Sequence, residues 1–242
     1  MDNYDRNIRI NFTLDIVWFK NKNMGQMKFK LALLGKGKTG SKVLELFPTA
    51  SVFDSKNPPK LDELKRFDVI ISFLPGEIFK KYIPMLLKTK IPLVIGSTGF
   101  DFPKNINQKL REKKILWVKS SNFALGMLVI KPMIEEMGKI EEITDDFSFS
   151  LSETHHIKKL DSPSGTALSW KNWLGMDVAI ASKREGDELG THNLTLKTPF
   201  EEITLTHKTL DRKIFAQGAL IAAKKVLKSK KKGLLDFRDL FL

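Results

Sequence analysis

Short, continuously apolar runs alternate with amphipathic stretches through the first half of the chain, from about residue 27 onward. The apolar runs predict buried strands at residues 29–35, 50–54, 68–74, 91–98 and 115–121. The amphipathic stretches predict helices at residues 41–47, 77–89 and 105–113. Strands that alternate with helices are typical of βαβ units, and strands that are apolar on both faces indicate a parallel sheet covered on both sides.

After Gly126 the apolar positions recur with a period of two. Residues 146–153 place phenylalanine and leucine on one face and serine on the other, and residues 202–210 alternate again. Such half-buried strands predict an open mixed or antiparallel sheet. A final apolar stretch at residues 214–227 predicts a helix that ends near Gly233 and packs back on the first half.

Composition narrows the classes of function. No apolar run approaches the ~20 residues that a membrane-spanning helix needs. The chain of 242 residues has no cysteine, which excludes disulfides and a cysteine nucleophile and fits the reducing cytoplasm. The net charge of +13 indicates either an anionic partner or a lysine-rich solvated surface. The dense lysine run at residues 224–232 lacks the interleaved aromatics typical of nucleic-acid binding, so we expect no nucleic-acid or membrane partner.

A glycine-rich loop lies between the first predicted strand and the first predicted helix. It contains G-x-G-x-x-G at Gly35, Gly37 and Gly40, and Asp54 ends the second predicted strand. This is the context of a dinucleotide-binding loop, in which glycines admit a pyrophosphate and the acidic residue accepts hydrogen bonds from ribose hydroxyls. The alternative is an ordinary glycine turn in a βα unit. Two further loops, residues 96–100 and 120–126, follow predicted strands and would line the same crevice.

The cofactor that this loop would prefer stays open between NADH and NADPH. The negative charge of Asp54 repels the 2′-phosphate of NADPH. Lys36, Lys38 and Lys56 lie nearby in the sequence and would attract that phosphate.

Two of the four histidines, His155 and His156, stand side by side before the turn at residues 163–166. Residues 167–174 predict a helix, so the turn would present free N–H groups and hydroxyls to an anion. Lys159 adds a positive charge, and lysine or histidine is a suitable proton donor. The alternative is a pair of solvent-exposed histidines beside ordinary helix capping. We expect no metal, because the chain lacks H-E-x-x-H and cysteine ligands.

The segment ETHHIKKLDSPSGTA, residues 153–167, resembles the signature E-x-H-H-x-x-K-x-D-x-P-S-G-T-A of the dihydrodipicolinate reductase family. The similarity extends along nearly the whole chain from Met27, and includes GSTGF, SSNFALG and three C-terminal blocks. The resemblance implies NAD(P)H-dependent reduction of 4-hydroxy-tetrahydrodipicolinate to tetrahydrodipicolinate in lysine and diaminopimelate biosynthesis. It also implies a cytoplasmic homotetramer assembled through the sheets of its substrate domain.

The resemblance also assigns residues. It implies that His155 is the acid/base residue and that Lys159 is the proton donor. It implies that the substrate is bound by His156, Ser164, Gly165 and Thr166. The implied cofactor contacts lie in the glycine loop, at the end of the second strand and in the two strand-end loops: Gly35, Lys36, Gly37, Lys38, Thr39, Gly40, Asp54, Gly96, Ser97, Thr98, Ser120, Ser121, Asn122 and Phe123.

Together the pattern and the resemblance predict an α/β fold, with an N-terminal Rossmann-like doubly wound parallel sheet and a C-terminal α+β substrate domain with an open mixed sheet. Residues 27–125 and 215–242 would form the dinucleotide-binding domain. Residues 126–214 would form the substrate-binding and oligomerisation domain. Residues 1–26 are an N-terminal extension with no recognised counterpart, and Met1, Met24 and Met27 are alternative start residues.

The chain departs from the pattern of the family at three places. The glycine loop is one residue shorter than G-x-x-G-R-M-G, Ser55 stands where some members have an arginine for the 2′-phosphate, and the stretch between Trp173 and Arg184 looks shortened. Two other functions stay open. One is a related Rossmann-type dehydrogenase of amino or hydroxy acids, and the other is a basic nucleic-acid-binding protein that kept the fold without activity.

Overall fold

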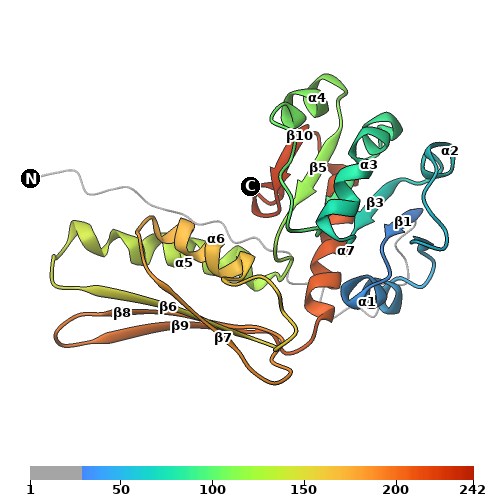
Figure 1. Ribbon diagram of the computed structural model, residues 1–242. Helices are drawn as coiled ribbons and strands as arrows, with labels where there is room; N and C mark the ends of the chain where they lie inside the picture. Colours follow the sequence, from blue (N-terminus) through green and yellow to red (C-terminus); the bar gives the residue numbers. More distant parts are fainter. Residues whose placement is uncertain (1–28) are drawn as a thin grey trace, which may run out of the picture.

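The computed structural model describes residues 29–242 and contains two β-sheets (Figure 1). The predicted extension at residues 1–26, and with it Met1, Met24 and Met27, lies outside the described residues. The first sheet has the strand order β10-β5-β4-β3-β1-β2, and every neighbouring pair is parallel. Its strands are β1 (Leu31–Leu34), β2 (Ser51–Phe53), β3 (Val69–Ser72), β4 (Leu93–Ile95), β5 (Leu116–Lys119) and β10 (Gly233–Asp236).

Helices cover both faces of the parallel sheet. They are α1 (Lys38–Leu46), α2 (Leu61–Leu64), α3 (Gly76–Thr89), α4 (Ile106–Glu112) and α7 (Lys213–Lys228). Successive side chains of a strand point to opposite faces, so Leu31 and Leu33 pack with α1 and α7, whereas Ala32 and Leu34 pack with α3 and α4. This two-sided burial explains why the strands are continuously apolar.

The second sheet has the order β7-β6-β8-β9 and is mixed, because β6 pairs in parallel with β7 and antiparallel with β8. Its strands are β6 (Ser148–His155), β7 (Ile180–Arg184), β8 (Thr191–Lys197) and β9 (Glu202–Lys208). The helices α5 (Gly126–Gly138) and α6 (Gly165–Leu174) lie along one face of this sheet (Figure 1). The alternation in β6 follows, since Leu151 packs under these helices while Ser150 is exposed.

The chain returns to the first sheet after β9. Helix α7 packs on α1 and on the central strands, as the sequence predicts, and β10 then adds to the edge of β5. The helix ends at Lys228 rather than near Gly233, because Gly233 begins β10. Two short 3-10 helices, η3 (Lys139–Glu142) and η4 (Arg238–Leu240), complete the described elements. None of the helices in residues 29–242 is both long and apolar enough to cross a membrane.

The predicted fold class is confirmed, with a Rossmann-like parallel sheet followed by a mixed sheet. The predicted strands correspond to β1 to β6 and β9, each within a few residues. The sequence pattern did not identify α2, α5, β7, β8 or β10. Of these, β7 and β8 complete the second sheet around the segment with two histidines.

Candidate active site

A cavity of about 740 Å³ lies at the carboxyl ends of β1, β2, β3 and β4. The glycine loop forms one wall through residues 35–39, and Asp54, Gly96 and Thr98 also line the cavity. Two of the predicted cofactor contacts in these loops do not line the cavity. Ser97 is buried with its hydroxyl 3.1 Å from that of Ser72, and Gly40 packs beneath the loop.

The glycine loop is tightly packed on one side and open on the other. Gly35 has a φ of +96°, and a Cβ on Gly40 would lie 2.0 Å from the carbonyl oxygen of Gly35, so helix α1 approaches the loop closely. Nothing lies within 4 Å of the position that a Cβ on Gly37 would take, which leaves open space over the start of α1. In the described chain no side chain caps that start, so its N–H groups face this space.

Two alanine substitutions in this loop are expected to have separable effects. Gly40→Ala places a methyl group against backbone that cannot move freely, so the free energy of unfolding falls by about 1–3 kcal/mol. Gly37→Ala meets no protein atom and leaves stability unchanged, but its methyl group occupies the space for the pyrophosphate and weakens NADH and NADPH binding. Urea unfolding and nucleotide titration of both variants check this. Equal nucleotide affinity of Gly37→Ala and the parent chain would contradict a pyrophosphate site here.

Asp54 is held in an ionised form at the end of β2. Its Oδ1 atom accepts backbone hydrogen bonds from Lys56 at 2.8 Å and Asn57 at 3.0 Å. These bonds, from Asn57 first and then Lys56, lower the pKa of the Asp54 carboxyl, and the charges of Lys56 and Lys36 act in the same direction. An ionised carboxylate is a suitable acceptor for ribose hydroxyls.

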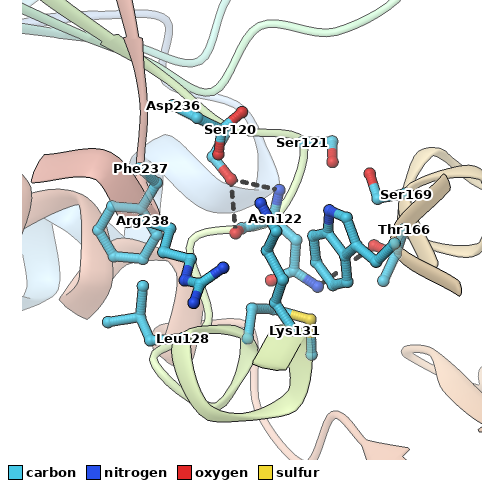
Figure 2. Close-up of a pocket in the computed structure, with 12 residues that line it drawn as sticks. Ser120, Ser121, Asn122, Leu128, Lys131, Thr166, Ser169, Asp236, Phe237 and Arg238 are labelled. Atoms are coloured by element: carbon cyan, nitrogen blue, oxygen red, sulfur yellow. Dashed lines mark hydrogen bonds between the residues drawn. The ribbon is translucent and has the colours of Figure 1, made fainter. Parts of the chain in front are cut away.

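A second, small cavity of about 70 Å³ lies where the two sheets meet (Figure 2). Ser120, Ser121 and Asn122 from the loop after β5 line it, and Thr166 lies opposite on α6. Asn122 bridges the two sides, because its Nδ2 donates to Thr166 Oγ1 at 3.2 Å while its Oδ1 accepts from the backbone of Ala124 at 2.8 Å. The strand-end loop is thus tied to the start of α6.

The first turn of α6 lies directly against this loop. A Cβ on Gly165 would lie 3.3 Å from Cβ of Ser121. Ser164 is 1% exposed, and its Oγ accepts the backbone N–H of Ala167 at 3.2 Å as the N-cap of α6. Phe123, a predicted cofactor contact, is buried and packs on Phe237 at 4.8 Å between ring centres.

His155 ends β6 inside the protein, with its ring Nδ1 hydrogen-bonded to the carboxylate of Glu153. Burial lowers the pKa of His155, and the nearby Glu153 carboxylate opposes that shift. Although burial acts to raise it, the pKa of Glu153 is lowered by hydrogen bonds from Ser182, His155 and Arg184. Glu153 is therefore an anion in the interior, and His155 is a neutral imidazole at pH 7.

Lys159 lies on the loop after β6, with its ammonium group on both carboxylate oxygens of Asp161 at 2.6 and 2.8 Å. It is close enough to His155 for its charge to lower the pKa of that histidine. His156 is half-buried, and burial, followed by the charge of Lys38 from the glycine loop, lowers its pKa. Of these three residues, His156 therefore lies within electrostatic reach of the glycine loop.

His192 is a buried residue beside this cluster for which the sequence analysis predicted no role. Its Nε2 lies 3.1 Å from Ser164 Oγ, and its ring centre lies 5.1 Å from that of His155. Burial first, then the proximity of His155 and His207, lowers the pKa of His192 to about 3, so it stays neutral. It supports the N-cap serine from inside the domain.

Glu153, His155 and His192 also form the one group within residues 29–242 whose ligand atoms are close enough for a metal, within 4.8 Å of one another. Arg184 Nη1 lies 2.9 Å from Glu153 Oε1, so a guanidinium already balances the carboxylate. A metal ion would have to displace this cation and compete with the His155 hydrogen bond. The geometry therefore favours an ion pair over a metal centre.

A Rossmann-like parallel sheet with a glycine loop, followed by a mixed sheet that carries a buried histidine with a lysine close by, is typical of a nicotinamide-dependent oxidoreductase. The models of the N-terminus and the C-terminus of dihydrodipicolinate reductase match residues 49–123 and 126–241, respectively. The chain belongs to the dihydrodipicolinate reductase family.

Individual relatives agree with this assignment. The chain is 34% identical over 216 residues to a 4-hydroxy-tetrahydrodipicolinate reductase of Thermosipho africanus, covering 85% of this chain and 94% of the relative. It is 31% identical over 232 residues to the enzyme of the same name from Christiangramia forsetii, covering 86% and 96%. The fold is similar to that of a dipicolinate-bound dihydrodipicolinate reductase from Paenisporosarcina sp. TG-14, with a TM-score of 0.65, 19% identity and coverage of 87% and 98%.

Proposed function

We propose that the protein reduces 4-hydroxy-tetrahydrodipicolinate to tetrahydrodipicolinate with NADH or NADPH, in lysine and diaminopimelate biosynthesis. The observation that carries this proposal is the junction between the two sheets. There the start of α6 meets the loop after β5 through the Asn122–Thr166 hydrogen bond. A small dicarboxylate seated on that helix start would lie beside both the loop after β5 and the segment that carries His155 and Lys159.

The proposed roles follow from charge and position. Gly165 and Thr166 bind a substrate carboxylate through the N–H groups at the start of α6, and His156 contacts the substrate. The hydroxyl of Ser164 is engaged with Ala167 and His192, so Ser164 supports substrate binding by holding the start of α6 in place. Loss of the 4-hydroxyl group as water leaves an unsaturated ring, to which a bound reduced nicotinamide would supply hydride. Lys159 supplies the accompanying proton, and His155 acts as the acid/base residue.

The proposed cofactor site comprises the glycine loop, Asp54 and the loops after β4 and β5. Asp54 favours NADH through its charge, whereas Lys36 and Lys56, whose charges lower its pKa, favour NADPH. Because these charges act in opposite directions, both NADH and NADPH need to be tested as cofactors. We propose no metal, since Arg184 balances the carboxylate of the single candidate cluster in residues 29–242.

We further propose a cytoplasmic homotetramer with a dinucleotide-binding domain at residues 27–125 and 215–242 and a substrate-binding domain at residues 126–214. The sheet face opposite α5 and α6 supports the assembly. It carries a polar ladder in which Thr195 and Thr204 share a hydrogen bond of 2.9 Å and Thr206 donates to Asn193 at 2.8 Å. Such a face is suited to pair with the same face of a second copy.

Ligand-induced changes in melting temperature test the proposal. NADH or NADPH at about 100 times its dissociation constant should raise the melting temperature by about 5–10 °C, and pyridine-2,6-dicarboxylate should add to that rise. A response to nucleotide without a response to the dicarboxylate would favour a related dehydrogenase. No response to either ligand, together with duplex DNA binding that weakens steeply with salt, would favour the nucleic-acid-binding alternative.

A further inference from the structure

The carboxylate of Glu153 is fully buried and is shared between three segments of the chain. It accepts hydrogen bonds from His155 Nδ1, from Ser182 and from the backbone N–H of Ser164 at 3.3 Å, and it pairs with Arg184 Nη1 at 2.9 Å. Burial of a charge without partners costs several kcal/mol of folding free energy, so the Glu153 carboxylate needs all of these partners to stay ionised in this position. Removal of any one partner would change the position or the charge balance of the others.

Arg184 extends this arrangement to the loop that carries Lys159. Its Nη2 donates to the backbone carbonyl of Asp161 at 2.5 Å, and the side chain of Asp161 holds the ammonium group of Lys159. The strand register makes this connection possible, because Arg184 on β7 lies opposite His155 on β6. One guanidinium therefore contacts both the partner of His155 and the backbone beside Lys159.

We propose that Glu153 and Arg184 are positioning residues that hold both proton-handling side chains, His155 through its ring Nδ1 and Lys159 through the backbone of Asp161. This inference rests on the proposed function for the roles of His155 and Lys159. Neither Glu153 nor Arg184 needs to touch the substrate, because each acts on a residue that does.

The contact with Glu153 determines which nitrogen of His155 is available for proton exchange. An ionised carboxylate only accepts hydrogen bonds, so Nδ1 carries the hydrogen and Nε2 is the reactive atom. Nε2 faces Gly190, where a Cβ would lie 2.8 Å from it. The glycine, with φ of +144°, leaves this nitrogen accessible where any other residue would cover it.

The two positioning residues act on His155 with opposite electrostatic signs. Burial is the largest influence and lowers the pKa of His155, Glu153 raises it, and the positive charges of Lys159 and Arg184 lower it further. The neutral rings of His192 on β8 and His156 on the following loop complete the titratable groups around it. Loss of the Glu153 charge and loss of the Arg184 charge should therefore shift the pKa of His155 in opposite directions.

The test is an NMR titration of the four histidines in the full chain, with His155 assigned from a His155→Gln variant. In Glu153→Gln the pKa of His155 should fall by at least about one pH unit, and in Arg184→Gln it should rise by a smaller amount, because the charge of Arg184 is the weaker influence. Lys183→Gln is the matched control, because Lys183 is the neighbour of Arg184 on β7 and pairs with Glu185 on the surface. It should leave the titration of His155 unchanged.

A conservative variant separates position from charge and also covers a failure of the others to fold. Arg184→Lys keeps the positive charge but cannot hold Glu153 and the Asp161 carbonyl together, so kcat should fall at least tenfold. The pKa of His155 and the KM for nucleotide should stay near those of the parent. Unchanged kcat in Arg184→Lys, or a His155 titration that does not respond to Glu153→Gln, would overturn the inference. Because the titration needs no substrate, a normal response in a chain without reductase activity would overturn the proposed function instead.

Discussion

Replacing Lys159 with alanine is expected to lower kcat by ~10²-fold or more, since a positioned proton donor typically contributes that much to a reaction. The ammonium group is held by both oxygens of Asp161 and lies close enough to His155 for its charge to lower the pKa of that histidine. Nucleotide affinity should be almost unchanged, because the cavity that includes the glycine loop is not lined by Lys159.

Steady-state kinetics and a nucleotide titration of Lys159→Ala measure both quantities. Lys158→Ala is the matched control, because Lys158 carries the same charge on the adjacent residue and is exposed. It should keep kcat within about twofold of the parent. Near-normal turnover of Lys159→Ala would remove Lys159 from its role as proton donor, whatever the behaviour of the control.

Gly218→Ala is expected to destabilise the protein by about 1–3 kcal/mol and to weaken cofactor binding as well. In an exposed helix this change would be stabilising by up to ~1 kcal/mol, because alanine has the higher helix propensity. At this position in α7, however, the added Cβ would lie 1.8 Å from the carbonyl oxygen of Phe123. Either the helix or the loop after β5 must move, and that loop includes Asn122 and its bond to Thr166.

Urea unfolding and NADH titration of Gly218→Ala check both parts of this expectation. Gly126→Ala is the control, because Gly126 begins α5 and a Cβ there would meet only the ring of His207 at 3.9 Å. That contact is an ordinary one, so the control should be neutral or slightly stabilising. Unchanged stability of Gly218→Ala would show that the packing of α7 against the loop after β5 does not constrain this position.

The elements that the sequence predicted are those in which local pattern and burial agree. The strands β1 and β3 are buried at every position because helices cover both faces, and β6 alternates because helices cover only one. The strand β10 was not predicted, because its four residues follow a lysine run. It forms by pairing with β5, which lies far away in the sequence. Such long-range pairing leaves little trace in a local pattern.

In the candidate site, too, local sequence predicted some features and long-range pairing determined the others. The helix start after Pro163 and the proton-donating residue types were recognisable from neighbouring positions in one segment. The contacts that hold them were not, since they depend on strand register: Arg184 lies opposite His155 across β6 and β7, and His192 lies opposite Glu153 across β6 and β8. Residue types predicted the chemistry, whereas tertiary pairing determined which buried groups support it.

A coupled assay tests the central proposal most directly. Aspartate semialdehyde, pyruvate and the synthase that precedes this reductase generate 4-hydroxy-tetrahydrodipicolinate in the cuvette, and nicotinamide absorbance is followed with NADH and with NADPH. We predict that absorbance falls only when the synthase, both of its substrates and this protein are all present, and that pyridine-2,6-dicarboxylate inhibits the fall. No oxidation of either cofactor above the rate without the protein would contradict the assignment of this chain as a 4-hydroxy-tetrahydrodipicolinate reductase.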